Sequence, residues 1–296
     1  MTIKSGFVSI VGRPNVGKST LLNKLIGQKV AIVSDKPQTT RNRIQGIYTS
    51  ERGQAIFIDT PGIHKPKHRL GEIMVDVASH SLREVDLILY VVDVTAQPGA
   101  GEDYIIKQLL EINNTPVVLV PNKVDLVEEE AIEPVVQQYS SRMNFSEVIP
   151  ISAAKGKNLD KLMDIVFSYL PEGPLYYPED EVTDQPQRFI ASELIREKAL
   201  RLTREEVPHS LAVEVEDFET RNNNMIYIRA VIYTERDSQK GIIIGQSGSM
   251  LRKIGEAARK DIEDMLESQV YLDLWVKVKK DWRNSESQLR NLGYKL

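Results

Sequence analysis

Short apolar runs alternate with longer amphipathic stretches along the first 170 residues of the chain. The runs are brief and rich in β-branched residues, which is typical of buried strands. They lie at residues 7–11, 55–58, 87–92, 117–120 and 148–151. Between them, apolar positions recur at the helical period, which predicts helices. These helices are expected at residues 18–26, 70–84, 104–112, 128–143 and 159–169.

This alternation predicts an α/β fold for the first region, with a mainly parallel, doubly wound sheet that carries helices on both faces. One pair of strands departs from the pattern. Residues 43–49 precede the strand at 55–58, and a tight Arg52-Gly53 turn lies between them. Because so short a connection joins antiparallel strands, we expect a hairpin and one antiparallel edge strand.

The pattern changes after residue 170. Residues 171–186 hold four prolines, five acidic residues and no lysine or arginine, which predicts a solvated, extended linker. A long surface loop within one domain is the alternative, and the new pattern that follows favours the linker. We therefore expect a first domain at residues 1–170, a linker at 171–186 and a smaller α+β domain at 187–296.

The second region has its own order of elements. A helix is predicted at residues 189–203, followed by alternating strands at 211–219 and 225–234 that Asn222-Asn223-Asn224 joins. Helical sequence surrounds residues 245–248, including an amphipathic helix at 250–266, and a last strand is predicted at 270–278.

Composition narrows the functional classes. A chain of 296 residues is long enough for two ordinary domains. The net charge of −4 excludes a uniformly basic nucleic-acid coat, so any RNA contact needs a local patch. The chain has no cysteine, which excludes disulfides, thiol catalysis and cysteine-ligated metal sites and suits the cytosol. No segment approaches the roughly 20 apolar residues of a membrane span, so we expect a cytoplasmic protein.

A glycine-rich segment follows the first strand and opens the first helix. Residues 12–19 read Gly-Arg-Pro-Asn-Val-Gly-Lys-Ser and fit the phosphate-loop pattern. Glycines let backbone N–H groups point at phosphates, and the helix N-terminus adds partial positive charge. Lys18 is expected to reach the β- and γ-phosphates, and the Ser19 hydroxyl to bind Mg²⁺. The predicted contacts in this segment are Gly12, Asn15, Val16, Gly17, Lys18, Ser19 and Thr20.

Two more segments are predicted to contact the phosphates and Mg²⁺. In Asp59-Thr60-Pro61-Gly62, which follows a strand, the carboxylate can hold Mg²⁺ through water and the Gly62 N–H can contact the γ-phosphate. In Gln38-Thr39-Thr40-Arg41, after the first helix, a threonine can complete the magnesium shell; Thr40 is preferred, and Thr39 is the alternative. The predicted catalytic residues are Lys18, Thr40, Asp59 and Gly62.

The guanine base is expected to contact two segments that follow later strands. In Asn122-Lys123-Val124-Asp125, the Asp125 carboxylate can accept the N1–H and N2 amine of guanine, whereas adenine would leave it unpaired. Asn122 can contact the base or brace the phosphate loop, and the Lys123 stem can cover the ring. In Ser152-Ala153-Ala154 a backbone N–H, with Ala153 preferred, can reach guanine O6.

A second candidate site lies in the C-terminal region. Gly245-Gln246-Ser247-Gly248 fits the Gly-x-x-Gly loop of a KH domain, which clamps about four nucleotides of single-stranded RNA. The pattern is weak alone, but two strands before it, a helix and one strand after it resemble the type II KH order. Nearby lysines and arginines support RNA binding, although they also suit solvated faces. The predicted RNA contacts are Lys240, Ile243, Gly245, Gln246, Ser247, Gly248, Arg252, Lys253, Lys277, Lys279 and Lys280.

These motifs, in this order, resemble the translation-factor-related class of P-loop GTPases. Together with the C-terminal loop they make the chain similar to the Era family of bacterial ribosome-assembly GTPases, over essentially its whole length. The resemblance implies hydrolysis of GTP with Mg²⁺, binding near the 3′ end of 16S ribosomal RNA and a role in assembly of the 30S subunit. It also implies a monomer and allows peripheral association with the cytoplasmic face of the membrane.

The resemblance leaves alternatives open around the reaction. Ras-like enzymes orient water with a glutamine after the Asp-x-x-Gly motif, but here the residue is Ile63, so slow intrinsic hydrolysis is expected. Similarity to potassium-stimulated GTPases suggests that Asn15 binds K⁺; shaping of the phosphate loop is its alternative role. Arg41 and Arg43 can stabilise charge, or face solvent or RNA. An RNA-modifying accessory GTPase and a nucleotide-gated membrane adaptor are the competing functions.

Overall fold

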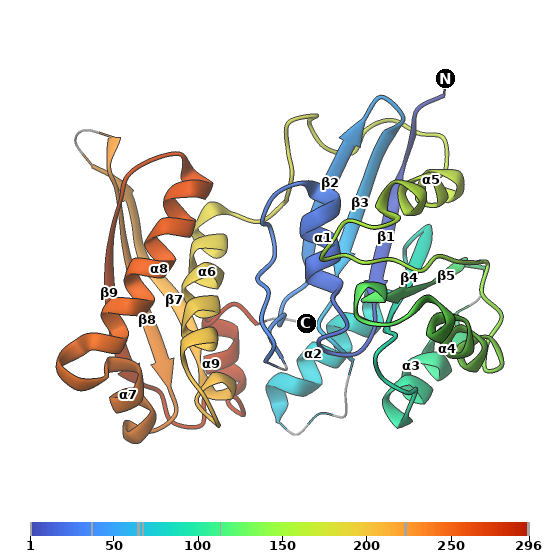
Figure 1. The fold of residues 1–296 in the computed structure, drawn as a ribbon. Helices are drawn as coiled ribbons and strands as arrows, with labels where there is room; N and C mark the ends of the chain where they lie inside the picture. Colours follow the sequence, from blue (N-terminus) through green and yellow to red (C-terminus); the bar gives the residue numbers. More distant parts are fainter. Residues whose placement is uncertain are drawn as a thin grey trace.

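Residues 2–36, 38–63, 66, 68–112, 114–221 and 224–294 are described by the structure, a computed structural model. The chain forms two lobes, each with its own sheet (Figure 1). The N-terminal lobe runs from β1 to α5 and the C-terminal lobe from α6 to α9. No helix in the described part of the chain is both long and apolar enough to cross a membrane.

The sheet of the N-terminal lobe has six strands in the order β2-β3-β1-β4-β5-β6. Only the β2–β3 pair is antiparallel and the other neighbours are parallel, so the predicted hairpin at the sheet edge is confirmed. The strands are β1 (Lys4–Val11), β2 (Ile44–Ser50), β3 (Gly53–Asp59), β4 (Leu87–Asp93), β5 (Val117–Asn122) and β6 (Glu147–Val148).

The prediction of a strand at residues 148–151, the last one expected in the N-terminal lobe, is mostly wrong, because β6 ends at Val148. Ile149 and Ile151 are buried, and each donates its N–H to a carbonyl of the β5 strand. The apolar pattern therefore reports burial of an extended edge segment that is hydrogen-bonded to β5.

Helices cover both faces of this sheet, as the alternating pattern predicts. One apolar cluster joins α1 (Lys18–Ile26) and α5 (Leu159–Tyr169) to one face, and another joins α2 (Arg69–His80), α3 (Ala100–Leu110) and α4 (Ile132–Ser140) to the other. The predicted helix at 128–143 is too long, since a 3₁₀ turn at Glu129–Ala131 precedes α4. Pro134 sits in the first turn of α4, where proline is tolerated.

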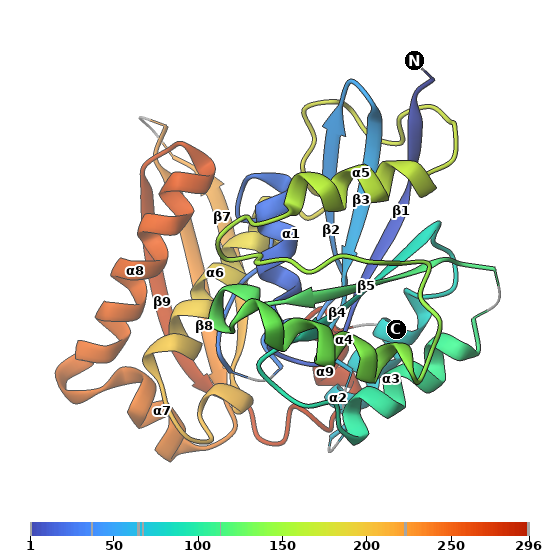
Figure 2. The ribbon, with the colours of Figure 1, turned by 45° about the vertical axis from the view of Figure 1, so that its right-hand side comes forward.

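The segment at residues 171–186 is extended, but it does not run free. Ser5 donates its N–H to Pro171 O at 3.0 Å, and Ile47 donates to Val182 O at 2.9 Å. The Gln54 side chain accepts both the Tyr176 and Tyr177 N–H groups at 2.9 Å. The extended segment thus binds along the β2–β3 hairpin (Figure 2), while most of its side chains are exposed, as its composition predicts. The exact domain boundaries stay a prediction.

The C-terminal lobe is α+β. Strands β7 (Ala212–Thr220) and β8 (Ile226–Thr234) are antiparallel, and β9 (Val270–Val278) is parallel to β8. The helices α6 (Gln187–Leu202) and α8 (Ser249–Leu266) share one apolar core with this sheet. The helices α7 (Asp237–Ile244) and α9 (Glu286–Asn291) complete the lobe, and the sequence pattern did not predict α9. Of the predicted Asn222-Asn223-Asn224 connection, the first two residues lie outside the described part.

The two lobes share an apolar contact. Leu70 and Met74 of α2 pack into one buried cluster with Trp282 and Tyr294 of the C-terminal lobe. Trp282 is fully buried and donates its Nε1–H to Ser210 O at 2.9 Å. The α2 helix is the next element after the Asp59–Gly62 segment, so this contact lies close in the chain to the predicted nucleotide site.

Candidate nucleotide and RNA sites

The phosphate loop connects β1 to α1. Gly17 has φ 101°, and a Cβ there would lie 2.3 Å from Asn122 Nδ2, so only glycine fits this turn. Lys18 is buried, and its Nζ donates to Gly12 O at 3.0 Å and to Arg13 O at 2.8 Å. Burial lowers the pKa of Lys18 to about 8, while the nearby Asp59 acts in the opposite direction. These two hydrogen bonds thus hold the Lys18 side chain against the phosphate loop.

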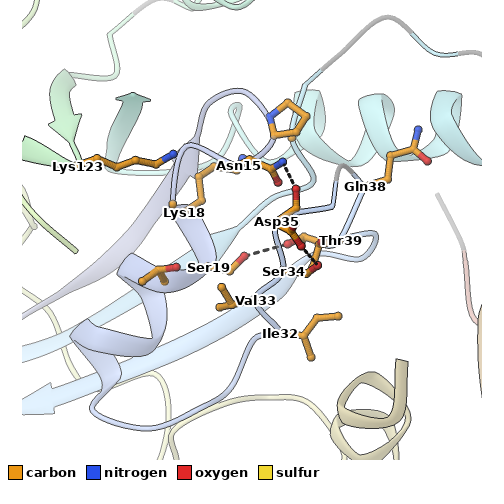
Figure 3. Close-up of a pocket in the computed structure, with 15 residues that line it drawn as sticks. Asn15, Lys18, Ser19, Ile32, Val33, Ser34, Asp35, Gln38, Thr39 and Lys123 are labelled. Carbon is orange, nitrogen blue, oxygen red and sulfur yellow. Dashed lines mark hydrogen bonds between the residues drawn. The ribbon is translucent and has the colours of Figure 1, made fainter. Parts of the chain in front are cut away.

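A cavity of about 420 Å³ opens beside this loop (Figure 3). It lies between the phosphate loop and the segment after α1, and Lys123, which follows β5, also lines it. Its lining includes Asn15, Gly17, Lys18, Ser19, Thr20, Thr39, Thr40, Gly62 and Lys123. Residues predicted from four separate motifs therefore meet at one cavity.

Three oxygen-bearing side chains converge at the predicted magnesium position. Ser19 Oγ donates to Asp59 Oδ2 at 2.6 Å and lies 2.9 Å from Thr40 Oγ1. Asp59 is fully buried, and its Oδ1 has no hydrogen-bond partner among the described residues. Burial raises the pKa of Asp59 to about 6, against the effect of Lys18. A buried carboxylate oxygen without a donor, beside two hydroxyls, fits a hard divalent cation held through water.

The structure also separates the two candidate threonines. Thr39 Oγ1 donates to Lys36 O at 2.6 Å, whereas Thr40 Oγ1 lies within hydrogen-bond distance of Ser19 Oγ. The geometry therefore favours Thr40.

The rest of the Asp59–Gly62 segment is largely structural. Thr60 is buried and its Oγ1 donates to Ile10 O at 3.0 Å, which leaves only its backbone for a nucleotide. Pro61 is buried as well. Ile63 is 1% exposed in the core beneath α2 and α3, so it cannot orient water at the cavity.

The base-side segments are linked by Asn122. Its Nδ2 donates to Val16 O at 2.8 Å, and its Oδ1 accepts the Ala153 N–H at 3.0 Å. In this state Asn122 braces the phosphate loop, and Ala153 could reach guanine O6 only by sharing its N–H; Ala154 is exposed. Asp125 is exposed, and Ser152 Oγ donates to its Oδ1 at 2.5 Å.

Asn15 reaches beyond the phosphate loop with its side chain. Its Nδ2 donates to Asp35 O at 2.7 Å, across the cavity mouth (Figure 3). The contact joins the phosphate loop to the segment after α1.

In the C-terminal lobe, residues 245–248 form the turn between α7 and α8. Gly245 has φ 71°, and a Cβ there would lie 2.8 Å from the Met250 N, so a glycine is required. Gln246 and Ser247 are exposed. Ile243 is fully buried in the core, so its predicted RNA contact is wrong: the apolar run before the loop packs inward, and Ile242 is the exposed isoleucine.

A groove of about 430 Å³ extends from this loop between α8 and β9. Leu251, Leu272 and Leu274 supply apolar lining, and Arg252 and Arg259 stand at its border. Apolar walls with adjacent guanidinium groups suit unstacked bases and their phosphates.

The predicted basic contacts differ in their surroundings. Arg252, Lys253 and Lys280 are exposed, and Lys240 is half-buried. Lys277 is paired with Glu216 at 2.9 Å, and Lys279 Nζ lies 4.3 Å from the centroid of the Tyr233 ring. Arg252 and Lys253 are thus the basic residues closest to the loop in the chain and open to solvent.

Near the cavity the structure corrects the expected role of Arg41 and adds two residues of α6 that sequence reasoning missed. Arg41 is 2% exposed and donates to Leu211 O at 2.6 Å, so it neither faces solvent nor stabilises charge in the pocket. The α6 helix contributes buried Arg196 and Glu197, which bind the same segment of the N-terminal lobe. The available signal was the presence of charged residues between the apolar positions of a helix whose apolar side chains are mostly buried.

The fold and the two sites define a P-loop GTPase joined to a KH domain. A family model for 50S ribosome-binding GTPases matches residues 7–123, and one for KH domains matches residues 206–283. GTPase Era of Heliobacterium modesticaldum is 57% identical over 292 residues, which cover 99% of this chain and 97% of the relative. GTPase Era of Staphylococcus haemolyticus is 54% identical, with 98% and 97% covered.

Two solved structures agree over the whole fold. A point variant of Aquifex aeolicus Era bound to GDP·AlF4⁻ and Era in complex with MgGDPNP and nucleotides 1506–1542 of 16S ribosomal RNA each show 44% identity. Each has a TM-score of 0.96 and covers 99% of this chain and 100% of the other. The chain therefore belongs to the GTPase Era family and is a GTPase.

Proposed function

We propose that the 420 Å³ cavity binds GTP with Mg²⁺ and that the C-terminal lobe binds the 3′ end of 16S ribosomal RNA. The nucleotide half rests on the convergence of Ser19, Thr40 and Asp59 beside Lys18. A solved relative holds MgGDPNP, which supports the same ion here.

The proposed residues act mainly by positioning and by charge. When bound, Mg²⁺ neutralises charge on the β- and γ-phosphates. Ser19 and Thr40 would hold it directly, and Asp59 through water. Lys18, released from Gly12 and Arg13 carbonyls, would stabilise charge on the transferred phosphoryl group. The Gly62 N–H would contact the γ-phosphate.

Because Ile63 cannot assist hydrolysis with a polar side chain, we propose that a monovalent cation stabilises charge in this site. Asn15 would hold K⁺ together with backbone carbonyls of the segment that it already contacts at Asp35. Replacing Na⁺ by K⁺ at matched ionic strength is expected to raise the GTP hydrolysis rate by at least about tenfold, since one preorganised charge-stabilising group can contribute about 10²–10³-fold. Asn15→Ala should remove this difference; equal wild-type rates in both salts would exclude the cation.

The RNA half of the proposal rests on the groove that opens at Gly248 between α8 and β9. A relative with 44% identity was solved with nucleotides 1506–1542 of 16S ribosomal RNA, which supports this RNA as the ligand. We extend the proposal to a monomer that assists 30S subunit assembly in the cytoplasm or at the cytoplasmic face of the membrane. That extension rests on the family.

Crosslinking in cells, with sequencing of the bound RNA, tests the RNA target. The expected result is enrichment at the 3′ end of 16S ribosomal RNA over total ribosomal RNA. Enrichment at sites of RNA modification instead would favour the accessory-GTPase alternative. An absence of crosslinked RNA beside membrane recovery of the protein would favour the adaptor.

A further inference from the structure

The C-terminal lobe binds the loop that carries Thr40. We call this loop, residues 29–36 and 38–41, the magnesium loop; it follows α1 and lies between the lobes (Figure 1). We propose that Arg196 of α6 is a positioning residue for GTP hydrolysis, because it holds the backbone beside Thr40. The inference rests on the proposed magnesium role of Thr40.

The Arg196 contact is buried and specific. Arg196 is 1% exposed, and its Nη2 donates to the backbone carbonyl of Thr39. The same guanidinium donates to both Glu193 carboxylate oxygens, at 2.7 and 2.6 Å. A buried charge is tolerated only when it is paired and hydrogen-bonded, so this arginine is oriented by Glu193 toward Thr39.

The residue on the other side of Thr40 is also held by the C-terminal lobe. Arg41 Nη1 donates to Leu211 O at 2.6 Å, and its guanidinium carbon lies 5.6 Å from the Trp282 ring centroid. With Thr39 and Arg41 both bound, the backbone of Thr40 has little freedom. Its Oγ1 is thereby kept 2.9 Å from Ser19 Oγ.

The first half of the magnesium loop is anchored to the same helix. Glu197 is fully buried, and its Oε1 accepts the Val33 N–H at 2.9 Å. Lys29 Nζ donates to Glu197 Oε2 at 2.5 Å, and Arg201 Nη2 donates to Val33 O at 2.7 Å. Helix α6 thus binds the loop at Lys29, Val33 and Thr39, and Arg196 makes the contact at Thr39, next to Thr40.

This arrangement separates two effects of losing Arg196. The magnesium position depends on Thr40, so hydrolysis and Mg²⁺ binding should suffer. The phosphate loop is braced from within its own lobe, by Asn122 at the end of β5, so GDP binding should not change. Removing partners that orient a metal ligand typically costs about 10- to 100-fold in metal affinity or activity.

The test uses the full chain with Arg196→Lys and Arg196→Ala. A lysine keeps a cation beside the buried Glu193 carboxylate, but its side chain is one atom shorter than the path to Nη2, the nitrogen that donates to both Glu193 and Thr39 O, so the bond to Thr39 O is lost. For both variants we expect kcat to fall by about tenfold and the half-saturating Mg²⁺ concentration with GTP to rise by about tenfold. GDP affinity should stay within about twofold, a change below 0.5 kcal/mol by the thermal relation.

Arg188→Ala is the matched control, because this α6 arginine also donates to a backbone carbonyl, that of Val215 in its own lobe. It should leave kcat and the Mg²⁺ requirement unchanged, and a thermal melt checks the folding of every variant. If Arg196→Ala does not fold, the kcat and the Mg²⁺ requirement of Arg196→Lys test the proposal. A folded Arg196 variant with wild-type kcat and Mg²⁺ requirement overturns the positioning role, whereas a wild type without GTP hydrolysis overturns the proposed function itself.

Discussion

Replacing Asp125 by Asn is expected to weaken GTP binding by about a thousandfold or more and to make xanthosine triphosphate the preferred nucleotide. A site built to hydrogen-bond one group rejects an analogue that lacks the match by about 10⁴-fold. In the proposed site the Asp125 carboxylate would accept two N–H groups of guanine, whereas an amide in its place would present a donor to one of them. Xanthine has a carbonyl oxygen where guanine has the amine, so the amide donor finds an acceptor.

The surroundings of Asp125 should let this exchange leave the fold intact. Asp125 is exposed, and Ser152 Oγ, which donates to its Oδ1, can donate equally to an amide oxygen. Asp103→Asn is the matched control, since Asp103 is an exposed carboxylate on α3 that pairs with Arg142, away from the cavity. Competition binding with GTP, xanthosine triphosphate and ATP measures the preference. Unchanged GTP preference in folded Asp125→Asn protein would remove Asp125 from the base site.

The paired change Gln246→Asp and Ser247→Asp should lower RNA affinity by at least about tenfold, roughly 1.4 kcal/mol. Both side chains are exposed in the turn between α7 and α8, where two carboxylates would repel an approaching phosphate. Gly245 and Gly248 are kept, so the turn can form, and the stability should change by no more than about 0.5 kcal/mol. The GTP hydrolysis rate without RNA should stay near that of the wild type.

A fluorescence titration with single-stranded RNA at several salt concentrations measures this effect, beside a thermal melt. Gln246→Asn with Ser247→Asn is the neutral control, because Asn tolerates the positive φ of 51° at Ser247 and adds no charge. Lys253→Ala should weaken binding less and reduce the salt dependence by about one charge. Full RNA affinity in the folded Asp pair would show that this loop is not the clamp.

Much of the nucleotide site could be predicted because its parts are local. The phosphate loop needs glycine where the backbone turns and a lysine at the helix start, so its identity is contained in a few adjacent residues. Strand ends of a parallel sheet meet at one edge, and therefore the segments that begin at Asp59, Asn122 and Ser152 could be expected to lie together from their order along the chain. The hairpin turn and the helix at 18–26 were predictable for the same reason.

The burial of individual side chains and the hydrogen-bond partners of the linker segment could not be predicted from local sequence. Ile243 and Ile242 are equally apolar, and only packing against the sheet decides that Ile243 is in the core and Ile242 is exposed. The acidic, proline-rich composition of residues 171–186 predicted exposure correctly for most side chains, yet composition does not reveal that backbone groups pair with the β2–β3 hairpin.

The sequence by itself determined the class of the protein, the order of its motifs and the two kinds of site, because each depends on residue types at short, fixed spacing. Tertiary structure alone decided that Thr40 rather than Thr39 joins Ser19 and Asp59, and that Arg41 enters the C-terminal lobe. It also brought Arg196 to the Thr39 carbonyl, 157 residues away along the chain. Such pairings depend on how two separately packed cores meet, and the spacing of residues within either core carries no information about that contact.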